Sequence, residues 1–485
     1  MSENAEQHDT CYGIEITAKM RRSGARLARR FTRHYATQSD ASFPLSACDN
    51  PILGPVFGLK DVVSDDTGTP IDYANAVFIG VIRMGYGHYR IGMALASAAR
   101  ARGYTPYWHD LLSFDSAGAR MIRDMDKWYS RGSRLSQMSR VFNRLLWDPL
   151  MGKWYKPFRR NYPMIKASKI LADVHAAIPR DTPFLATHPF NANGALHAGL
   201  ERVVNVVPDN CPLGFHLAPG ALHTVQSPSA YFIFRTLRGL GDDNAAGQGV
   251  PSSDVQLTGH YVDHELTANI PNDCDARLER IREKAPRRLL ISIGGAGAQQ
   301  AVLIDILKHL MPQIEQGHVS LFLNCGDHHA ALKRFADTVP GFQAAATQHY
   351  DWADMQAFAV MAQQHKVTGL HVFCHDDPFV AVYATNMLMR VADILLTKPS
   401  ELAYYPIPKL FIERVGGHEA WGAIRSAEIG DGTPECTGTS FTLHALNTML
   451  QEDDLLGFYC EQIKMLHASG IYNGAYNAVD MAVGG

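Results

Sequence analysis

The sequence lacks three features: a long apolar run, a closely spaced cysteine pair and an excess of charge of one sign. Without a run of about 18 apolar residues, no transmembrane helix is expected. The two cysteines nearest in sequence, Cys436 and Cys460, are too far apart for a CxxC zinc or redox motif, so we expect scattered, reduced thiols. The 45 Lys and Arg against 48 Asp and Glu give a net charge of −3, which argues against a dedicated nucleic-acid-binding protein.

The first residues also lack the apolar core of a secretory signal, so the sequence predicts a cytoplasmic protein. With 485 residues, 46% hydrophobic and 19% charged, the composition is that of a folded protein of two or three domains. Residues 19–33 nevertheless hold seven basic side chains, and apolar residues recur on one face of the helix that they would form. Such a basic amphipathic helix can lie peripherally on anionic lipid at the inner membrane face, or it can be a solvated extension.

From residue 76 the pattern changes to alternating strands and helices. The run AVFIGVI at 76–82 is continuously apolar, as in a strand buried on both faces, and the helix-forming run IGMALASAARAR at 91–102 follows it after a loop. Further strands are expected at 183–186 and 202–207. Strands that alternate with helices favour a parallel sheet covered by helices.

The same pattern starts again near residue 287. Strands are predicted at 288–293, 319–324, 370–374, 393–397 and 409–412, with helical segments between most of them. The chain is therefore expected to be an α/β protein. Its expected parts are an N-terminal basic extension and linker at 1–72, an α/β domain at 73–265, a second α/β domain at 266–430 and a helical tail at 431–485.

Between the predicted strands at 76–82 and 183–186, residues 125–166 combine many aromatic residues with many Lys and Arg. This combination suits a membrane interface or an amphiphilic acceptor, because such side chains have an apolar body and a polar tip. It also suits single-stranded nucleic acid, or simply the core of a helical subdomain. The sequence leaves these interpretations open.

Glycine-rich turns follow the first strand of each predicted α/β domain. The first turn contains Gly85 and Gly87, and the second contains Gly294, Gly295, Gly297 and Gln299. Neither matches GxGxxG or GxxxxGK[ST], so a P-loop nucleotide hydrolase is not expected. Glycine lets a ligand approach the backbone, and the free N–H groups of the following helix attract phosphate. One turn in each domain predicts a phosphate-bearing ligand in a cleft between the domains.

Polar residues follow several strands, at the edge where open α/β sheets bind their ligands. His88 closes the first turn, where a helix N-terminus favours the neutral imidazole that a base requires. Further positions of this kind in the first domain are His188, Asn191, Asp209 and His216, and in the second domain Lys398, Ser400, Glu401, His418 and Glu419. Asp209 is a candidate general base, and a carboxylate in the second domain could hold a ribose diol. Helix capping and plain loop structure are the alternative roles. No metal site is predicted, because adjacent histidines such as His328 and His329 do not share a helix face.

These segments, in this order, resemble the GT-B glycosyltransferases, and among them the branch of the monogalactosyldiacylglycerol synthases, diglucosyldiacylglycerol synthases and lipid-II-forming N-acetylglucosaminyltransferase. The turn GYGH is similar to the N-terminal Gly-Gly-Gly-His turn of that branch, and ATHPF to its His-Pro strand end. VVPDNCPLGFHLAPGALHTVQSP resembles its Asp-to-His segment, and ISIGGAGAQ resembles its loop over the donor diphosphate. ADILLTKPSELAYYPIPKLFIERVGGHEAWGA is similar to its nucleotide-sugar segment, and the likeness covers about 76–425.

The resemblance implies two Rossmann-like domains with an interdomain cleft and an inverting transferase without metal or other cofactor. An acceptor hydroxyl, on a lipid or another amphiphile, would attack the sugar C1 as the nucleoside diphosphate, expected to be UDP, leaves. His88 or Asp209 would take the acceptor proton. The Gly-rich turns and the polar residues of the second domain would bind the donor, and His188, Asn191 and His216 would line the acceptor side. The expected partners are a nucleotide sugar and a lipid or membrane-surface acceptor, with no nucleic acid.

The sequence also departs from the family pattern. Glu401 follows Lys398 by only three positions, with Pro399 between them, where the family has a longer Lys-to-Glu segment. His260 and Tyr261 replace the usual Ile and Pro, and 344–368 looks like an insertion. A GT-B-like scaffold without catalytic activity and a nucleotide-sugar epimerase of the same fold therefore stand as alternatives to a glycosyltransferase.

Overall fold

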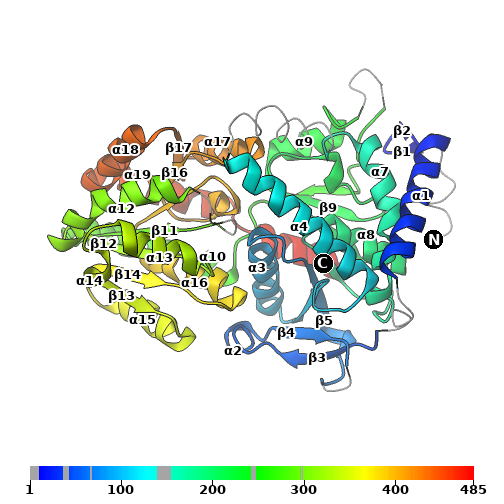
Figure 1. The fold of residues 1–485 in the computed structure, drawn as a ribbon, viewed down its shortest axis with the longest axis horizontal. Helices are drawn as coiled ribbons and strands as arrows, with labels where there is room; N and C mark the ends of the chain where they lie inside the picture. The colour runs from blue at the N-terminus through cyan, green and yellow to red at the C-terminus, as the bar shows by residue number, and fades with distance from the viewer. Residues whose placement is uncertain are drawn as a thin grey trace. The chain divides into compact units, whose positions relative to one another are not determined.

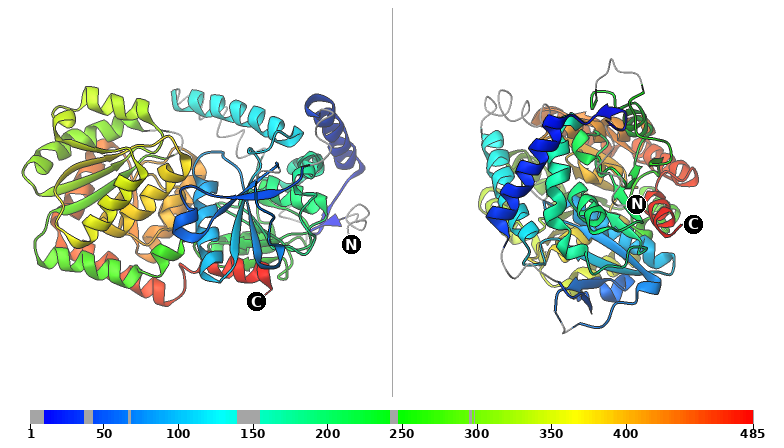
Figure 2. Two further views of the ribbon diagram at one scale, coloured as in Figure 1. Left: turned by 90° about the horizontal axis from the view of Figure 1, so that it is seen from below. Right: turned by 90° about the vertical axis from the view of Figure 1, so that its right-hand side faces the viewer.

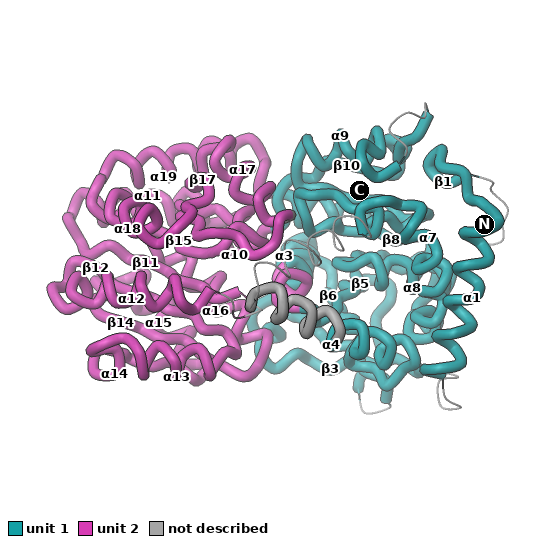
Figure 3. The backbone as a smooth tube through the Cα atoms, turned by 45° about the horizontal axis from the view of Figure 1, so that its top comes forward, with its two compact units in different colours: residues 1–84, 91–261, 473–485 teal, residues 85–90, 262–472 magenta. Residues whose placement is uncertain are grey.

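The computed structural model describes residues 10–36, 43–65, 68–138, 155–241, 247–294, 297 and 299–484, with the backbone alone at 128–138 and 418. These residues form two compact units (Figure 3). Unit 1 comprises Met1–Met84, Ile91–Tyr261 and Asn473–Gly485, and unit 2 comprises Gly85–Arg90 and Val262–Tyr472. Among the helices described, none is both long enough and apolar enough to cross a membrane.

Unit 1 is built on an eight-stranded sheet in the order β10-β9-β8-β7-β5-β6-β4-β3. All neighbouring strands are parallel except the antiparallel pair β3 and β4. In chain order the strands are β3 (Ser46–Asp49), β4 (Lys60–Val63), β5 (Ala76–Val81), β6 (Thr105–Asp110), β7 (Phe184–Ala186), β8 (Val203–Val206), β9 (Leu222–Val225) and β10 (Val255–Leu257). The segment predicted as a linker thus contains two strands of this sheet.

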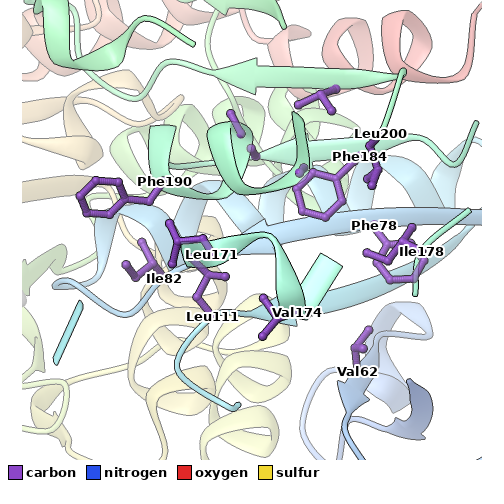
Figure 4. Packing of buried hydrophobic residues seen from close by; sticks show 14 of the residues in the cluster. Val62, Phe78, Ile82, Leu111, Leu171, Val174, Ile178, Phe184, Phe190 and Leu200 are labelled. Atoms are coloured by element: carbon purple, nitrogen blue, oxygen red, sulfur yellow. The ribbon is translucent and has the colours of Figure 1, made fainter. Parts of the chain in front are cut away.

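Helices cover the sheet of unit 1 and continue its α/β pattern (Figure 1). They are α1 (Ala18–Tyr35), α2 (Gly54–Phe57), α3 (Gly87–Ala101), α4 (Ala117–Met138), α7 (Phe158–Ala167), α8 (Pro189–Ala198), α9 (Pro228–Thr236) and α20 (Gly474–Val483). A short hairpin of β1 (Thr10–Cys11) and β2 (Ile14–Glu15) precedes them. Phe78 of β5 and Phe184 of β7 pack with Leu171 and Val174 in an apolar cluster of the unit (Figure 4).

Unit 2 contains a seven-stranded sheet that is parallel throughout, in the order β13-β14-β12-β11-β15-β16-β17. In chain order the strands are β11 (Arg287–Ser292), β12 (Val319–Asn324), β13 (Ala346–His349), β14 (Gly369–Phe373), β15 (Ile394–Thr397), β16 (Lys409–Ile412) and β17 (Gly432–Cys436). The inner strands β11, β12, β15 and β16 are buried along their whole length, as expected for their apolar runs, and β11 and β16 also bury basic residues at their starts.

Helices lie on both faces of the sheet of unit 2 (Figure 2). They are α10 (His264–Thr267), α11 (Ile270–Arg282), α12 (Gln300–Glu315), α13 (His329–Thr338), α14 (Phe342–Ala345), α15 (Trp352–Gln364), α16 (Pro378–Val391), α17 (Ala420–Ile429), α18 (Thr439–Gln451) and α19 (Asp453–Ala468). The apparent insertion at 344–368 forms the edge strand β13 and helix α15. The predicted α/β class with two Rossmann-like units is confirmed by these two sheets.

Unit 2 also buries a polar cluster around Asp263. The Asp263 side chain is fully buried, Tyr405 Oη donates to its Oδ2 at 3.3 Å, and its Oδ1 has no hydrogen-bond partner among the described residues. The guanidinium of Arg90 lies 5.7 Å from the centre of the Tyr405 ring and donates to Asn386 at 2.6 Å. Burial, reinforced by the charge of Glu265, raises the pKa of Asp263 from 3.8 to about 7.

This raised pKa predicts a pH-dependent term in the free energy of unfolding. Because the folded state binds the proton more tightly, this stabilisation is complete below the unfolded pKa and is lost as the pH rises through about 7. Wild type is therefore expected to lose on the order of 4 kcal/mol relative to Asp263→Asn between about pH 4 and pH 7. Urea unfolding across this range measures the difference, with Asp305→Asn, an exposed carboxylate of α12, as the control. A difference that does not vary with pH would contradict the assignment.

Candidate functional site

The order of the strands in unit 2 locates its ligand-binding edge. The chain leaves β11 towards β12 on one side and returns to pair β15 with the other side of β11, so the topology switches between these two strands. Open α/β sheets bind ligands beyond the carboxyl ends of the strands at such a switch point. A small pocket lies there, and it is lined by Ser292, Ile293, Gly294, Gln299, Leu303, Leu396, Thr397, Lys398 and Ile412. Three predicted donor residues, Gly294, Gln299 and Lys398, line this one pocket.

A buried ion pair joins the loops after β15 and β16. Lys398 Nζ contacts Glu419 Oε1, and Oε2 of the same carboxylate accepts the N–H groups of Val415 and Gly416 at 2.8 and 3.2 Å. Both side chains are largely buried, at 17% and 6% exposed. A Cβ at Gly294 would lie 2.9 Å from Lys398 Cε, so glycine leaves the room that the lysine occupies. The geometry therefore places a cation directly against the Gly-rich turn.

The second Gly-rich turn connects β11 to α12 through residues with left-handed backbone. Gly297 has φ +61° and donates to the Gly294 carbonyl at 2.8 Å, and Gln299 has φ +64°. The Gln299 amide donates to the Glu413 carbonyl in the loop after β16. Gly295, the remaining predicted residue of this turn, lies outside the described residues. The turn ends at the N-terminus of α12, where free N–H groups and the helix dipole favour an anion.

The first Gly-rich turn belongs to unit 2, with the rest of Gly85–Arg90. Tyr86 Oη bonds to the Asp327 carboxylate, and the Asp327 N–H donates back to Tyr86 Oη at 2.9 Å. A Cβ at Gly87 would be 3.9 Å from Glu401 Oε2, so this predicted pair is close in space. His88, the second residue of α3, is half-buried. The loop after β12 thus meets the first turn through a tyrosine that the sequence pattern did not single out.

His328 is a second residue of this edge that was missed as a binding candidate. Its Nε2 donates to the Gly294 carbonyl at 3.1 Å, and its ring would be 3.2 Å from a Cβ at Gly297. The sequence drew attention to it only as a metal ligand. In the part of the chain that the structure describes, no group of three or more His, Cys, Asp or Glu side chains is arranged to hold a metal ion.

The remaining predicted donor residues lie on the two loops already described. The Ser400 N–H donates to the Lys398 carbonyl at 2.8 Å, and the Ser400 carbonyl accepts from Ala403 at 3.0 Å, so this serine shapes the turn. Glu401 begins a short 3-10 helix, η8 (Glu401–Tyr404), and is half-buried. His418 stands in a second one, η9 (Gly417–Glu419), and its side chain lies outside the described residues.

In unit 1 the topology switches between β5 and β7. His188 follows β7 and caps α8, its Nδ1 accepting the Phe190 N–H at 3.1 Å. Asn191 is fully buried and donates to the Val81 carbonyl at 2.8 Å, which fastens α8 to the end of β5. Asn191 therefore holds the frame of the switch point and does not face solvent, although the sequence suggested a place on the acceptor side.

Asp209 and His216 form a pair beyond the carboxyl end of β8. His216 Nε2 lies 3.5 Å from Asp209 Oδ2, and the carboxylate side chain is 42% exposed against 7% for the imidazole. His216 Nδ1 accepts the Leu213 N–H at 3.3 Å, so the ring proton resides on Nε2 and points to the carboxylate. The pair therefore consists of an accessible carboxylate oriented by a buried neutral imidazole.

Neighbouring residues fix this pair in place. The Gln226 amide donates to the Pro208 carbonyl at 2.6 Å, and the Asn205 amide donates to the His216 carbonyl at 2.6 Å. The ring of Phe215 packs between those of His216 and His188, at centroid distances of 6.2 and 5.6 Å. Three predicted residues from the segments after β7 and β8, His188, Asp209 and His216, are thus gathered at one edge of unit 1.

Two family models match the chain, one in each half. Residues 10–236 match a model described as Domain of unknown function (DUF6937), and residues 250–483 match one described as Domain of unknown function (DUF6938). A comparison with curated proteins found no match.

Several solved structures are similar to this one at low sequence identity. WaaG, a glycosyltransferase involved in lipopolysaccharide biosynthesis, is 14% identical over 84% of this chain and 100% of its own, with a TM-score of 0.42. The UDP-GlcNAc 2-epimerase from Neisseria meningitidis, bound to UDP-GlcNAc, is 10% identical over 82% and 97%, with a TM-score of 0.43. The spinosyn rhamnosyltransferase SpnG is 13% identical over 83% and 98%, with a TM-score of 0.33. At these TM-scores the likeness carries no argument about function, and the fold is assigned from the two sheets themselves.

Proposed function

We propose that this protein is a GT-B-type glycosyltransferase that moves a sugar from a nucleoside-diphosphate sugar, with UDP as the expected nucleotide, to an acceptor hydroxyl. The observation that carries the proposal is the edge of unit 2 at the switch point. There, a Gly-rich turn, the N-terminus of α12 and the Lys398 ammonium surround one small pocket. Backbone N–H groups and a cation together suit a diphosphate, which must carry additional charge as it leaves.

The rest of the donor has complementary groups at the same edge. Glu401 and Glu419 place carboxylates in the loops after β15 and β16, and a carboxylate can hold a ribose diol by two hydrogen bonds. Glu419 already accepts from Lys398, Val415 and Gly416, which leaves Glu401 as the better candidate. Tyr86 and Asp327 supply hydroxyl and carboxylate oxygens that can bind the sugar hydroxyls.

The Asp209–His216 pair provides the base in this proposal. The acceptor O–H proton passes to the Asp209 carboxylate while the oxygen attacks the sugar C1, and the bond from C1 to the diphosphate oxygen breaks. Attack from the face opposite the leaving diphosphate inverts the configuration at C1. The buried Nε2–H of His216 orients Asp209 and stabilises its charge before the proton arrives. His88, near the first Gly-rich turn, is the competing candidate for the base.

Binding of UDP is the first test. UDP at about 100 times its dissociation constant is expected to add about 2.7 kcal/mol to the stability of the folded protein and to raise its melting temperature. Gly294→Asp puts a carboxylate beside Lys398 in the diphosphate pocket, so the affinity for UDP should fall by at least about 30-fold through like-charge repulsion.

The control for this test is Gly457→Asp, the same substitution in α19, where a Cβ meets no atom within 4 Å. It should leave UDP affinity unchanged. A protein that no nucleoside diphosphate stabilises would contradict the proposed function, and equal UDP affinity in Gly294→Asp and Gly457→Asp would contradict the pocket.

A nucleotide-sugar epimerase is the second candidate, and one observation favours it. Elimination and re-addition of the nucleotide need acid and base groups at the sugar but no acceptor, and unit 2 carries Tyr86, Asp327 and His328 beside its own Gly-rich turns. Incubation of UDP-sugars alone distinguishes the two enzymes, because only the epimerase changes the sugar without an acceptor. Release of UDP that depends on an added hydroxyl acceptor identifies the transferase, and tight binding without turnover identifies a scaffold.

A further inference from the structure

Helix α1 concentrates positive charge without any opposite charge. Its 18 residues contain seven Lys and Arg side chains and no Asp or Glu, and its last turn adds His34. Helix α7, which packs against it, also lacks acidic residues and exposes Arg159 and Arg160. The other neighbouring helix, α4, carries Asp124, which pairs with Lys127 of the same helix. Neighbouring exposed arginines repel one another, so a folded protein gains no stability from this arrangement.

The charges of α1 lie on the side that faces away from unit 1. Met20 and Gly24 are buried, Leu27 and Phe31 are half-buried, and a Cβ at Gly24 would lie 2.9 Å from Lys166 of α7. At 3.6 residues per turn these four residues fall on one side of the helix. The opposite side, within an arc of about 100°, carries the basic face, which consists of Lys19, Arg22, Arg26, Arg29, Arg30 and Arg33.

All six residues of the basic face are exposed, and none forms an ion pair with a residue that the structure describes. Arg21, by contrast, lies off this face and donates to the Ile16 carbonyl at 3.1 Å. Figure 1 and the right view of Figure 2 show α1 running along the outside of unit 1 beside α7. The basic face is thus a row of cations over about four helical turns, without ion-pair partners among the described residues.

We propose that the basic face of α1 docks unit 1 on an anionic lipid surface. The apolar side of α1 is already packed against the protein, so it is not available for insertion into the bilayer. Attraction between the cations and anionic headgroups is therefore the whole of the interaction at this helix, and it is screened by salt. This inference does not rest on the proposed enzymatic function.

The arrangement fits lipid better than single-stranded nucleic acid. Proteins that bind single strands stack aromatic side chains on the bases between their basic residues. The aromatic residues of α1, Phe31 and Tyr35, are half-buried on the protein side, which leaves no aromatic platform on the basic face. A flat row of cations matches the plane of headgroup charges without such platforms.

Sedimentation of the full chain with vesicles tests the proposal. The protein should bind phosphatidylcholine vesicles that contain about 30% phosphatidylglycerol and should not bind pure phosphatidylcholine. Binding should be lost when NaCl is raised from about 0.1 M to about 0.5 M. The triple variant Arg22→Gln, Arg26→Gln, Arg33→Gln should lower the partition coefficient by roughly 100-fold, because each basic residue near the surface contributes about fivefold.

The matched control removes the same charge from unit 2 through Lys308→Gln, Arg334→Gln and Lys366→Gln, three exposed residues. It should bind within about twofold of wild type, and both triple variants should melt at the wild-type temperature. Equal loss in the two variants, or equal binding to neutral vesicles, would overturn the proposal. Single-stranded DNA that displaces the protein from vesicles at an affinity equal to that of the lipid would assign the basic face to nucleic acid instead.

Discussion

Asp209→Asn is expected to lower the turnover of the proposed transferase by about 10²- to 10⁴-fold, the usual contribution of a general base. The amide keeps the size of the side chain and its contact with His216 Nε2, 3.5 Å away, but it cannot take the acceptor proton. UDP affinity should stay within about twofold of wild type, because the proposed donor residues belong to unit 2. The measurement is UDP release from the most active UDP-sugar in the presence of its acceptor, together with UDP binding by calorimetry.

Two further variants make this result interpretable. Asp181→Asn removes an exposed carboxylate from the same unit and should leave turnover unchanged. His88→Ala tests the competing base, and the proposal requires it to lower turnover less than Asp209→Asn does. Wild-type turnover in Asp209→Asn, combined with a large loss in His88→Ala, would transfer the role of base to His88.

Lys409→Met is expected to destabilise the protein by about 3–5 kcal/mol, which is the effect of breaking a buried ion pair from one side. Lys409 Nζ lies 2.9 Å from Asp431 Oδ2, and both side chains are 0% exposed. Tyr472 Oη and Ser426 Oγ also donate to the Asp431 carboxylate. Without the ammonium, that carboxylate would lose its ion-pair partner while it stays buried. Urea unfolding gives the free energy difference.

Adding Asp431→Leu to Lys409→Met distinguishes the loss of the ion pair from the loss of side-chain packing. In the double variant Lys409→Met with Asp431→Leu, no buried charge is left unpaired, so a large part of the lost stability should return. Lys333→Met is the surface control, because Lys333 pairs with Asp337 in an exposed i,i+4 arrangement and its loss should change stability by less than about 1 kcal/mol. A double variant as unstable as the sum of the two single variants would show that the pair acts only through packing.

Most of the strands predicted from the sequence are buried along their whole length. β5, β11, β12 and β16 were expected within one residue of where they occur, because a fully buried strand is apolar at every position. β6 was missed because its sequence TPYWHD contains proline, histidine and aspartate, although its last five residues are buried. The edge strands β3, β10 and β13 were missed because they are short and partly exposed, so they carry neither an apolar run nor clear alternation.

Many residues of the candidate site were predicted from the sequence, but their contacts were not. The rule that ligands bind beyond strand ends selected Gly294, Lys398, Asp209 and His216 before any contact was known. The contacts themselves could not be predicted, because each is made between loops that only the folded sheet brings together. Lys398 meets Glu419 across two strand ends, and Tyr86 meets Asp327 from a distance of 241 residues along the chain. The predicted domain boundary at residue 265 stays a prediction. The two compact units are each made of more than one segment of the chain, which a division of the sequence into consecutive domains does not describe.

The return of the chain to unit 1 after Tyr472 has a consequence for dissecting this protein. The N-terminus of α20 is locked onto residues 258–261: Gly474 donates to the His260 carbonyl at 2.9 Å, and Asn477 donates to the Thr258 carbonyl at 2.8 Å. A Cβ at Gly474 would lie 2.2 Å from the Gly259 carbonyl oxygen, so no other residue fits there. A fragment that ends at Tyr261 would lack α20, which belongs to unit 1. The second family model, over residues 250–483, therefore includes a helix that folds with unit 1. We expect a fragment that ends at Tyr261 to be stable only when α20 is added as a separate peptide or fused through a new linker.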